Sequence, residues 1–477
     1  MTLPTITVTR KSPMRKIFVP ILLILAACAG FAAHQLFAPP KVSTPLSVLT
    51  HPDGDLYVGD QVSFEVFNPT LSQPASDSLR ISLAGETLAE ENFAPFGMGG
   101  RSQATFFWVW NTRGLKPGDY TLTFSLLPGL THWDEKISLL PAADVQAPEP
   151  DAHWVSVDTT CCVISYISGT DAEKDLEALK SMAAVQAADV ERRMDAKYAQ
   201  KIPLTFLPRT LGQGGFTSDG IYVSYLHQNY AGSTIQQIVH HEMVHWLDNQ
   251  LGGRLRPSIL EEGLAVYLSD GHFKVEPILP RAAAIIDLGW YIPLRQLTNS
   301  FYFSQHEVGY AEAAALVNYL ITTYGWDKFN LFYRDIHSAP SGLPADALDA
   351  ALQAHFSISL DQLEQNYLAF LQQQTVTDSI RTDLRMTVTF YDAVRRYESE
   401  MDPSAYFLHT WLPDVSQMRQ RNIVADFLRH PHSLLNQQIE GLLVSADTNL
   451  LVDHYTTAEN EIRTVNSLLD LKKYLGN

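Results

Sequence analysis

Two histidines and a glutamate lie close together in the segment His241-Glu242-Met243-Val244-His245. Residues four apart on a helix lie on one face, one turn above the other. The imidazoles of His241 and His245 can therefore bind the same Zn²⁺ ion. Glu242, directly after the first histidine, is then placed to take a proton from water that the metal activates. The segment predicts hydrolysis of a carbonyl bond at a zinc site.

The flanking residues predict that this segment is helical. The segment Gly232-Ser233-Thr234 offers an N-cap, and no helix breaker intervenes before Gly252 and Gly253, which can end the helix. Apolar residues recur at helical spacing, which predicts a partly buried helix rather than a loop. These residues are Ile235, Ile238, Val239, Val244 and Leu247.

A catalytic zinc ion commonly takes three protein ligands and keeps one position open. The acidic candidates after His245 are Asp248, Glu261 and Glu262. Asp248 lies about one turn further along the same helix, which favours a supporting role over ligation. Glu261 and Glu262 begin a second helical stretch after the turn at 251–257, and neighbours on a helix point about 100° apart. One of the two can reach the ion easily, and spacing alone does not choose between them.

The motif H-E-x-x-H followed by Glu262-Gly263-Leu264-Ala265 resembles the gluzincin branch of zinc metallopeptidases. In that branch the third ligand is the glutamate directly before such a glycine, so the resemblance implies Glu262. Residues 153–374 resemble the bacterial peptidase MA-like family in particular. The other parts that carry this resemblance are a strand-like segment at 221–225 and a later segment at 310–314.

The later segment, which begins at Tyr310, is similar to the Tyr-x-Lys-Gly-Ala segment of related aminopeptidases, whose tyrosine steadies the oxyanion. The resemblance implies Tyr310 as the oxyanion donor. This sequence lacks the Lys-Gly pair and has Glu261 where those aminopeptidases carry asparagine. An aromatic anchor in a helix is the alternative role for Tyr310; Tyr302 and His306 are further candidate donors. The sequence also lacks the Gly-x-Met-Glu-Asn type of exopeptidase motif, so we expect an endopeptidase.

The chain has 477 residues and a formal net charge of −18. A nucleic-acid binder needs a basic face, so this charge argues against nucleic acid. The resemblance to zinc metallopeptidases implies a peptide or protein substrate. The three cysteines are too few for a disulfide framework. We expect the neighbours Cys161 and Cys162 to be reduced, because a disulfide between adjacent residues is strained.

The N-terminal sequence predicts that most of the protein lies outside the cytoplasm. Four basic residues between Arg10 and Lys16 precede an uncharged apolar run at 17–33. Positive charge before such a run favours a cytoplasmic N-terminus and export of the remaining chain. Three outcomes stay open: a retained membrane helix, a lipoprotein anchored at Cys28 in the lipobox-like Leu25-Ala26-Ala27-Cys28, and a cleaved signal peptide. We expect a single N-terminal membrane anchor with the catalytic part extracytoplasmic.

Alternating apolar residues after residue 47, among them Val62, Phe64 and Val66, predict short strands. The expected fold class is multidomain: an N-terminal membrane segment, an all-β Ig-like sandwich, an α+β zincin-like catalytic domain and an α-helical C-terminal region. The expected boundaries are 1–46 for the basic segment, apolar run and stalk, 47–142 for the sandwich, 153–374 for the peptidase-like domain and 375–477 for the helical region.

The expected function is thus a zinc-dependent peptidase with His241, His245 and Glu262 as ligands and Glu242 and Tyr310 as catalytic residues. The main alternative is a non-catalytic envelope protein that binds a partner and keeps a degenerate zinc fold as a scaffold. A purely structural zinc is a third possibility, although structural sites are usually closed and rich in cysteine. Glu242 favours the enzyme, because neither alternative needs a base.

Overall fold

A computed structural model describes residues 46–68, 77–97, 101–129, 131–212, 214–406, 408 and 414–475. Its strands form three sheets. The first sheet has the order β1-β3-β7-β6, the second β2-β9-β8-β4-β5, and the third, called the central sheet below, β10-β11-β12-β14-β13. Their bounds are β1 Ser47–His51, β2 Leu56–Tyr57, β3 Gln61–Phe67, β4 Ser78–Leu83, β5 Glu86–Asn92, β6 Ala94–Phe96, β7 Arg101–Asn111, β8 Gly118–Leu127, β9 His132–Leu140, β10 Trp154–Asp158, β11 Cys162–Ile167, β12 Ile202–Leu207, β13 Gly215–Thr217 and β14 Ile221–Ser224.

The first two sheets bury apolar side chains that alternate along their strands, as a half-buried strand requires. Phe64 of β3 and Phe124 of β8 meet edge to face, with ring centroids 5.9 Å apart. The first sheet is antiparallel, whereas the second contains one parallel pair, β2 with β9.

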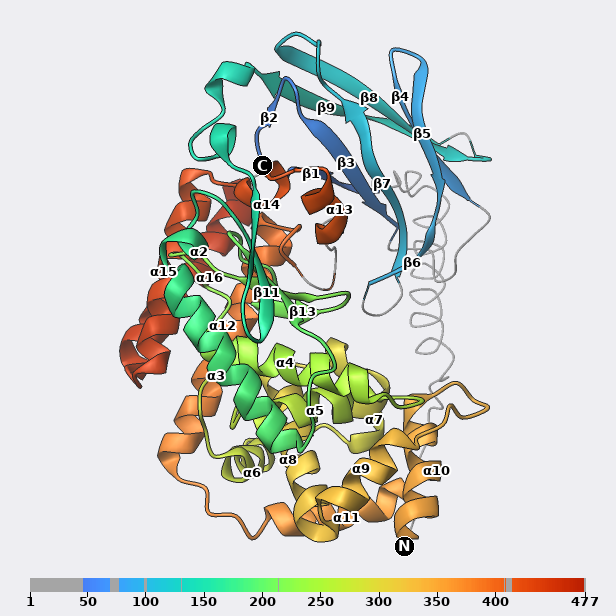
Figure 1. Cartoon of the computed structure of the whole chain (residues 1–477), viewed down its shortest axis with the longest axis vertical. Helices are drawn as coiled ribbons and strands as arrows, with labels where there is room; N and C mark the ends of the chain where they lie inside the picture. Colours follow the sequence, from blue (N-terminus) through green and yellow to red (C-terminus); the bar gives the residue numbers. More distant parts are fainter. Residues whose placement is uncertain are drawn as a thin grey trace, which may run out of the picture. The chain divides into compact units, whose positions relative to one another are not determined.

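Helices make up most of the chain after residue 170 (Figure 1). Their bounds are α2 Asp171–Lys174, α3 Leu176–Met194, α4 Ile235–Leu251, α5 Ser258–Leu268, α6 Ile278–Asp287, α7 Leu294–Asn299, α8 His306–Tyr324, α9 Trp326–Arg334, α10 Pro344–Phe356, α11 Leu360–Leu371, α12 Asp378–Met401, α13 Val415–Gln420, α14 Ala425–Leu428, α15 Leu434–Leu451 and α16 Tyr455–Leu475. Short 3-10 helices lie at Ala142–Asp144, Glu149–Asp151 and Phe301–Phe303.

The central sheet is covered on both faces. Phe206 of β12 and Val223 of β14 belong to the large core that includes α3, α4, α5 and α8. Their neighbours Leu207 and Tyr222 point to the opposite face, where they pack with Met418 of α13 and residues of α14. Because side chains alternate along a strand, one set packs against helix α4, which carries His241 and His245, and the other set packs against the C-terminal part of the chain.

Residues after 400 form ion pairs and hydrogen bonds with residues from much earlier in the chain. Arg429 pairs with Asp60 of the N-terminal part and with Glu149, and the buried Arg209 bonds Asp402 over 2.8 Å. In Figure 1 the red helices α13 and α14 accordingly lie beside the blue strands β1 to β3. Such contacts join residues more than 190 positions apart in the sequence.

The predicted multidomain fold class is wrong. The described residues from Ser47 onward form one compact unit of mixed α/β structure, in which neither an Ig-like sandwich nor a zincin-like domain stands apart. The sequence pattern indicates local strands and helices, but it does not show that α13 and α14 return to cover the central sheet and contact β3.

The predicted membrane segment at 17–33, with Cys28, lies outside the described residues. Within the described part of the chain, no helix has both the length and the apolar character needed to cross a bilayer. Cys161 and Cys162 form a disulfide, so the expectation that both are reduced is wrong. That expectation assumed a regular strand, whereas Cys161 precedes β11 and lies in the turn after β10.

Candidate metal centre

Helix α4 positions the two histidines of the motif. It begins after Thr234, whose hydroxyl accepts a hydrogen bond from the backbone N–H of Gln237, and it ends at Gly252 with φ 76°. The sequence predicts both ends correctly, because an N-cap threonine and a C-terminal glycine satisfy the helix termini. His241 and His245 therefore lie one turn apart on the face that borders a cavity.

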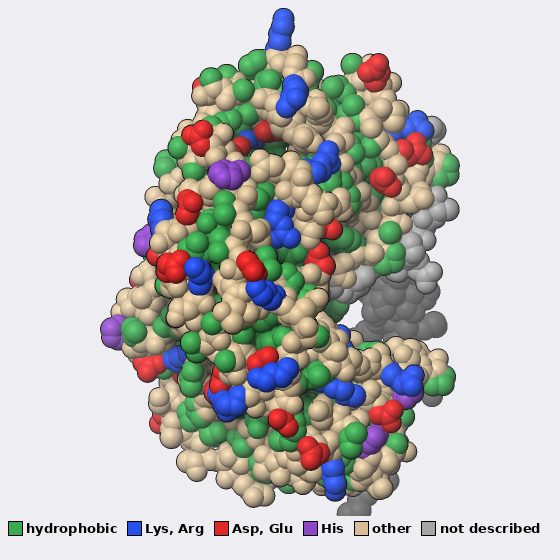
Figure 2. Space-filling model, in the orientation of Figure 1, with side chains coloured by type: hydrophobic (Ala, Val, Ile, Leu, Met, Phe, Trp, Pro, Cys, Tyr) green, Lys and Arg blue, Asp and Glu red, His purple; other side chains and the backbone are tan. Residues whose placement is uncertain are grey.

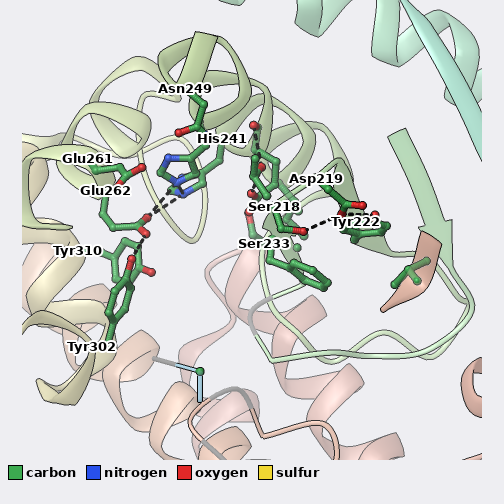
Figure 3. Close-up of a pocket in the computed structure, with 18 of the residues that line it drawn as sticks. Ser218, Asp219, Tyr222, Ser233, His241, Asn249, Glu261, Glu262, Tyr302 and Tyr310 are labelled. Carbon is green, nitrogen blue, oxygen red and sulfur yellow. Dashed lines mark hydrogen bonds and ion pairs between the residues drawn. The ribbon is translucent and has the colours of Figure 1, made fainter. Parts of the chain in front are cut away.

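Three ligand atoms converge at this face (Figure 3). Nε2 of His241 and Nε2 of His245 are 2.9 Å apart, and each lies 3.2 Å from Oε2 of Glu262. A triangle of this size lets one metal ion reach all three atoms at about 2 Å, the usual distance from a metal to imidazole nitrogen or carboxylate oxygen. The donor set is thus suited to a metal ion.

Helix α5 supplies Glu262, and its approach depends on Gly263. A Cβ at position 263 would meet the backbone carbonyl of Ala313 and lie 2.9 Å from Cγ2 of Val317, both on α8. The small residue therefore permits close packing of α5 on α8. The other carboxylate oxygen, Oε1 of Glu262, accepts a hydrogen bond from the hydroxyl of Tyr302 at 2.7 Å. That bond leaves Oε2 turned toward the histidines.

Without a metal, the side chains of His241, His245 and Glu262 shift one another's pKa values. Burial lowers the pKa of His241 to about 4, so its imidazole is neutral at pH 7. Burial acts in the same direction on His245, but the facing carboxylate of Glu262 outweighs it and raises the pKa of His245 to about 10. Burial would raise the pKa of Glu262, yet the histidines hold it well below its ordinary value. Binding of a metal by neutral imidazoles would release the proton of His245.

Glu242 lies in the same cavity, one residue along α4 from the first ligand. Its Oε2 accepts a hydrogen bond from the hydroxyl of Thr217 at 2.8 Å. Gly215, on the same strand as Thr217, also leaves room for this side chain, because a Cβ there would lie 3.1 Å from Cγ of Glu242 and 2.8 Å from Cγ2 of Ile238. Burial raises the pKa of Glu242 to about 7, against the opposing effects of His245 and Thr217. The carboxyl group is therefore buried, oriented and able to exchange a proton near neutral pH.

Tyr310 lines the same cavity, together with His272. The Tyr310 ring stacks on His272 with centroids 4.2 Å apart and lies 6.3 Å from the ring of His241. In Figure 3 Tyr302 and Tyr310 lie below Glu262, and Asp219 and Tyr222 lie at the opposite end of the view. The structure thus brings all five predicted site residues to one cavity of about 640 Å³.

The remaining acidic candidates have other partners. Asp248 is not a ligand, because Arg334, Arg256 and the hydroxyl of Tyr333 all bond its carboxylate. Glu261 lines the cavity but faces Arg256 at 3.4 Å. Between the two adjacent glutamates, the structure therefore turns Glu262, not Glu261, to the histidines.

A second group of ligand-type residues lies beside the first and consists of His272, His306 and Glu307. Glu307 is already paired with Arg281 at 2.9 Å, and Arg395 donates to Nδ1 of His306 at 2.9 Å. A divalent cation at this group would face two guanidinium groups. In the group of His241, His245 and Glu262, the second carboxylate oxygen of Glu262 bonds a neutral tyrosine hydroxyl instead. This group is therefore the better candidate for binding a metal ion.

No family model matches this chain, and no curated protein is similar to it. On the face in Figure 2, Lys and Arg side chains are interspersed with Asp and Glu among the described residues, with no continuous basic field.

Two residues of this centre could not be found by sequence reasoning. Thr217 lies 25 residues before Glu242, on the edge strand of the central sheet, and nothing in its neighbourhood signals a hydrogen bond to the base. His272 follows Gly271 in a loop after α5, and only the fold brings it against Tyr310. Tyr302 is a candidate donor from the sequence; in the structure it lines the cavity and its hydroxyl donates a hydrogen bond to Glu262.

Proposed function

We propose that this chain is a zinc-dependent peptidase that cleaves peptide bonds within protein or peptide substrates. One observation carries the proposal: Oε2 of Glu262 and Nε2 of both motif histidines converge within 3.2 Å of one another, in the cavity that also holds Glu242.

The donor set favours zinc over other common ions. Two imidazole nitrogens and one carboxylate oxygen are typical of catalytic Zn²⁺ with an open fourth position, whereas Ca²⁺ and Mg²⁺ prefer sets of oxygen ligands. Bound Zn²⁺ supplies Lewis acidity, which acidifies water and polarises a carbonyl group. His241, His245 and Glu262 would hold it.

Glu242 would then transfer the proton between the attacking water and the leaving amine. Glu242 accepts one proton from the attacking water, whose oxygen bonds to the carbonyl carbon of the scissile peptide. The C–N bond breaks, and Glu242 returns the proton to the leaving amine. Tyr310, which lines the same cavity, would donate a hydrogen bond to the oxyanion that forms between these steps.

The motif-level resemblance to gluzincin peptidases, and to the bacterial peptidase MA-like family, supports the same chemistry. The contacts of Glu242 also favour an enzyme over a scaffold protein. A scaffold needs only the three ligands, whereas here a separate carboxyl group is buried beside them and held by Thr217.

We also propose that the chain acts outside the cytoplasmic membrane. The support is the order of basic residues and the apolar run in residues 10–33. Mass spectrometry of the N-terminus of the mature protein distinguishes retention, lipidation at Cys28 and cleavage. A full-length, unmodified N-terminus on cytoplasmic protein would contradict export.

The test of function uses unfolded casein as the substrate. We expect the zinc-loaded chain to cleave casein at internal bonds, a chelator to stop cleavage, and added Zn²⁺ to restore it. His245→Ala should lose both bound zinc and cleavage. A wild-type chain that binds no zinc would contradict the proposal.

A further inference from the structure

Strand β7 contains an irregularity where it pairs with β3. Phe64 pairs with Phe106 and Val62 pairs with Trp110, so the three residues of β7 between these pairs face one residue of β3. Trp108, in the middle of this β-bulge, has φ 48°. A bulky residue rarely adopts that left-handed conformation, and such bulges often redirect a side chain next to a functional site.

Contacts from two directions hold the bulge. The backbone N–H of Trp108 donates to Oγ of Ser63 at 2.7 Å. The guanidinium of Arg421, at the end of α13, lies over the indole ring of Trp108 at 4.4 Å and donates to Oε1 of Gln61 at 2.9 Å. The strained conformation is therefore a fixed part of the fold.

The side chains of β7 next to the bulge alternate between the two faces of the strand. Phe106 is buried in the core, whereas Phe107 is 41% exposed. Phe107 also lines the cavity that holds the metal-binding residues. Of the large apolar side chains that are exposed in the described part of the chain, Phe107 alone lines this cavity.

Other apolar groups line the same cavity. Phe96 comes from the edge strand β6, Phe216 from the edge strand β13, and Val415 from the start of α13. The Phe216 ring is stacked on Tyr222 with centroids 5.0 Å apart. The described lining residues include no Lys or Arg, so neither of these residues would pair with an acidic side chain of the substrate there.

We propose that Phe107, which lies next to the β7 bulge, binds a large apolar side chain of the peptide substrate together with Phe96 and Phe216. The inference deepens the proposed peptidase function and rests on it. An aromatic or branched aliphatic side chain would cover Phe107 and bury apolar surface of both partners. The first sheet would then help to select the substrate, while α4 and α5 hold the metal.

The first experiment measures specificity. A peptide library with all residue types at each position is cleaved by the zinc-loaded wild type, and the products are identified by mass spectrometry. We expect Phe, Leu, Ile and Met to be enriched at one position relative to the cleaved bond. Phe107→Ala should reduce this enrichment about tenfold, and Phe107→Leu should retain most of it.

Leu331→Ala is the matched control, because Leu331 is an exposed apolar residue on α9 that does not line the cavity. It should keep the wild-type preference. Thermal unfolding of each variant checks that the fold is intact. An apolar preference that survives in Phe107→Ala, or a wild type without such a preference, would overturn the inference.

The second experiment needs no turnover. Two capped hexapeptides of Ala and Gly, one with a central Phe and one with Ala in its place, are titrated into zinc-loaded Glu242→Gln protein by calorimetry. We expect the Phe peptide to bind about tenfold more tightly, and Phe107→Ala in the same background to remove the difference. Equal binding of both peptides contradicts the inference. If the wild type cleaves nothing while this difference persists, the peptidase function fails and the apolar binding site stands.

Discussion

The hydroxyl of Thr217 donates a hydrogen bond to Oε2 of Glu242 over 2.8 Å, so the edge strand β13 orients the carboxylate that we assign as the base. The backbone of Gly215, two residues earlier, lies against the same side chain. Two residues of β13 thus contact the side chain of Glu242, which helix α4 carries.

Removal of that hydroxyl should reduce turnover and leave the metal in place. We expect Thr217→Val to lower kcat about tenfold to a hundredfold, because the base remains but loses its orientation. Thr217→Ser keeps a hydroxyl and should retain most of the activity. Casein cleavage rates with parallel zinc analysis measure both effects. Wild-type kcat in Thr217→Val would show that the hydrogen bond has no role in turnover.

Tyr302 should matter for metal affinity, because its hydroxyl orients Glu262 at 2.7 Å. We expect Tyr302→Phe to weaken zinc binding about 10- to 100-fold, as loss of a hydrogen bond to a metal ligand commonly does. Competition with a zinc-binding dye gives the affinity. Tyr291→Phe is the control, since the hydroxyl of Tyr291 bonds Glu364 rather than a metal-binding residue. Equal affinities in all three proteins would refute this role.

Gly263→Ala should destabilise the protein although alanine is the better helix former. The new Cβ would meet the carbonyl of Ala313 on α8, and overpacking of this kind costs about 1–3 kcal/mol. Gly441 lies on α15 with no atom within 4 Å of its added Cβ. Gly441→Ala should therefore stabilise by up to about 1 kcal/mol. Chemical denaturation of both variants gives the free energies of unfolding, and a shift of the same sign in both would contradict the packing argument.

Much of the metal site could be predicted from the sequence, because its parts are local. Thr234 and Gly252 mark the ends of α4, and the four-residue spacing places His241 and His245 on one face. The choice of Glu262 over Glu261 came from resemblance, not from spacing. In the structure, the small Gly263 faces α8 rather than the histidine helix.

The fold class could not be predicted, because the decisive contacts join distant residues. Arg429 pairs with Asp60, and Met418 packs with Tyr222 on the second face of the central sheet. A local pattern of alternating or helical periodicity carries no information about such partners. The bulge at Trp108 is equally invisible in the sequence, since it depends on register with β3.

Asp447 on α15 should make stability depend on pH. Burial raises its pKa from 3.8 to about 7, so the folded state keeps a proton that the unfolded state releases above about pH 4. The contribution of Asp447 to the free energy of unfolding is therefore greatest at low pH. It declines between about pH 4 and 7 and is constant at higher pH. Asp447→Asn should therefore flatten the pH dependence and raise stability at pH 8 by on the order of 2 kcal/mol. Denaturation at pH 5 and pH 8 tests the sign; a larger decline from pH 5 to pH 8 in the variant would refute it.

The most direct test of the peptidase proposal compares wild type with Glu242→Gln in one paired measurement of bound zinc and casein cleavage. Glutamine keeps the size of the side chain but cannot take the proton. We expect about one zinc per chain in both proteins, with cleavage reduced at least a hundredfold, or about 2.7 kcal/mol, in the variant. Cleavage at the wild-type rate by zinc-loaded Glu242→Gln would contradict the assignment of Glu242 as the base and with it the proposed mechanism.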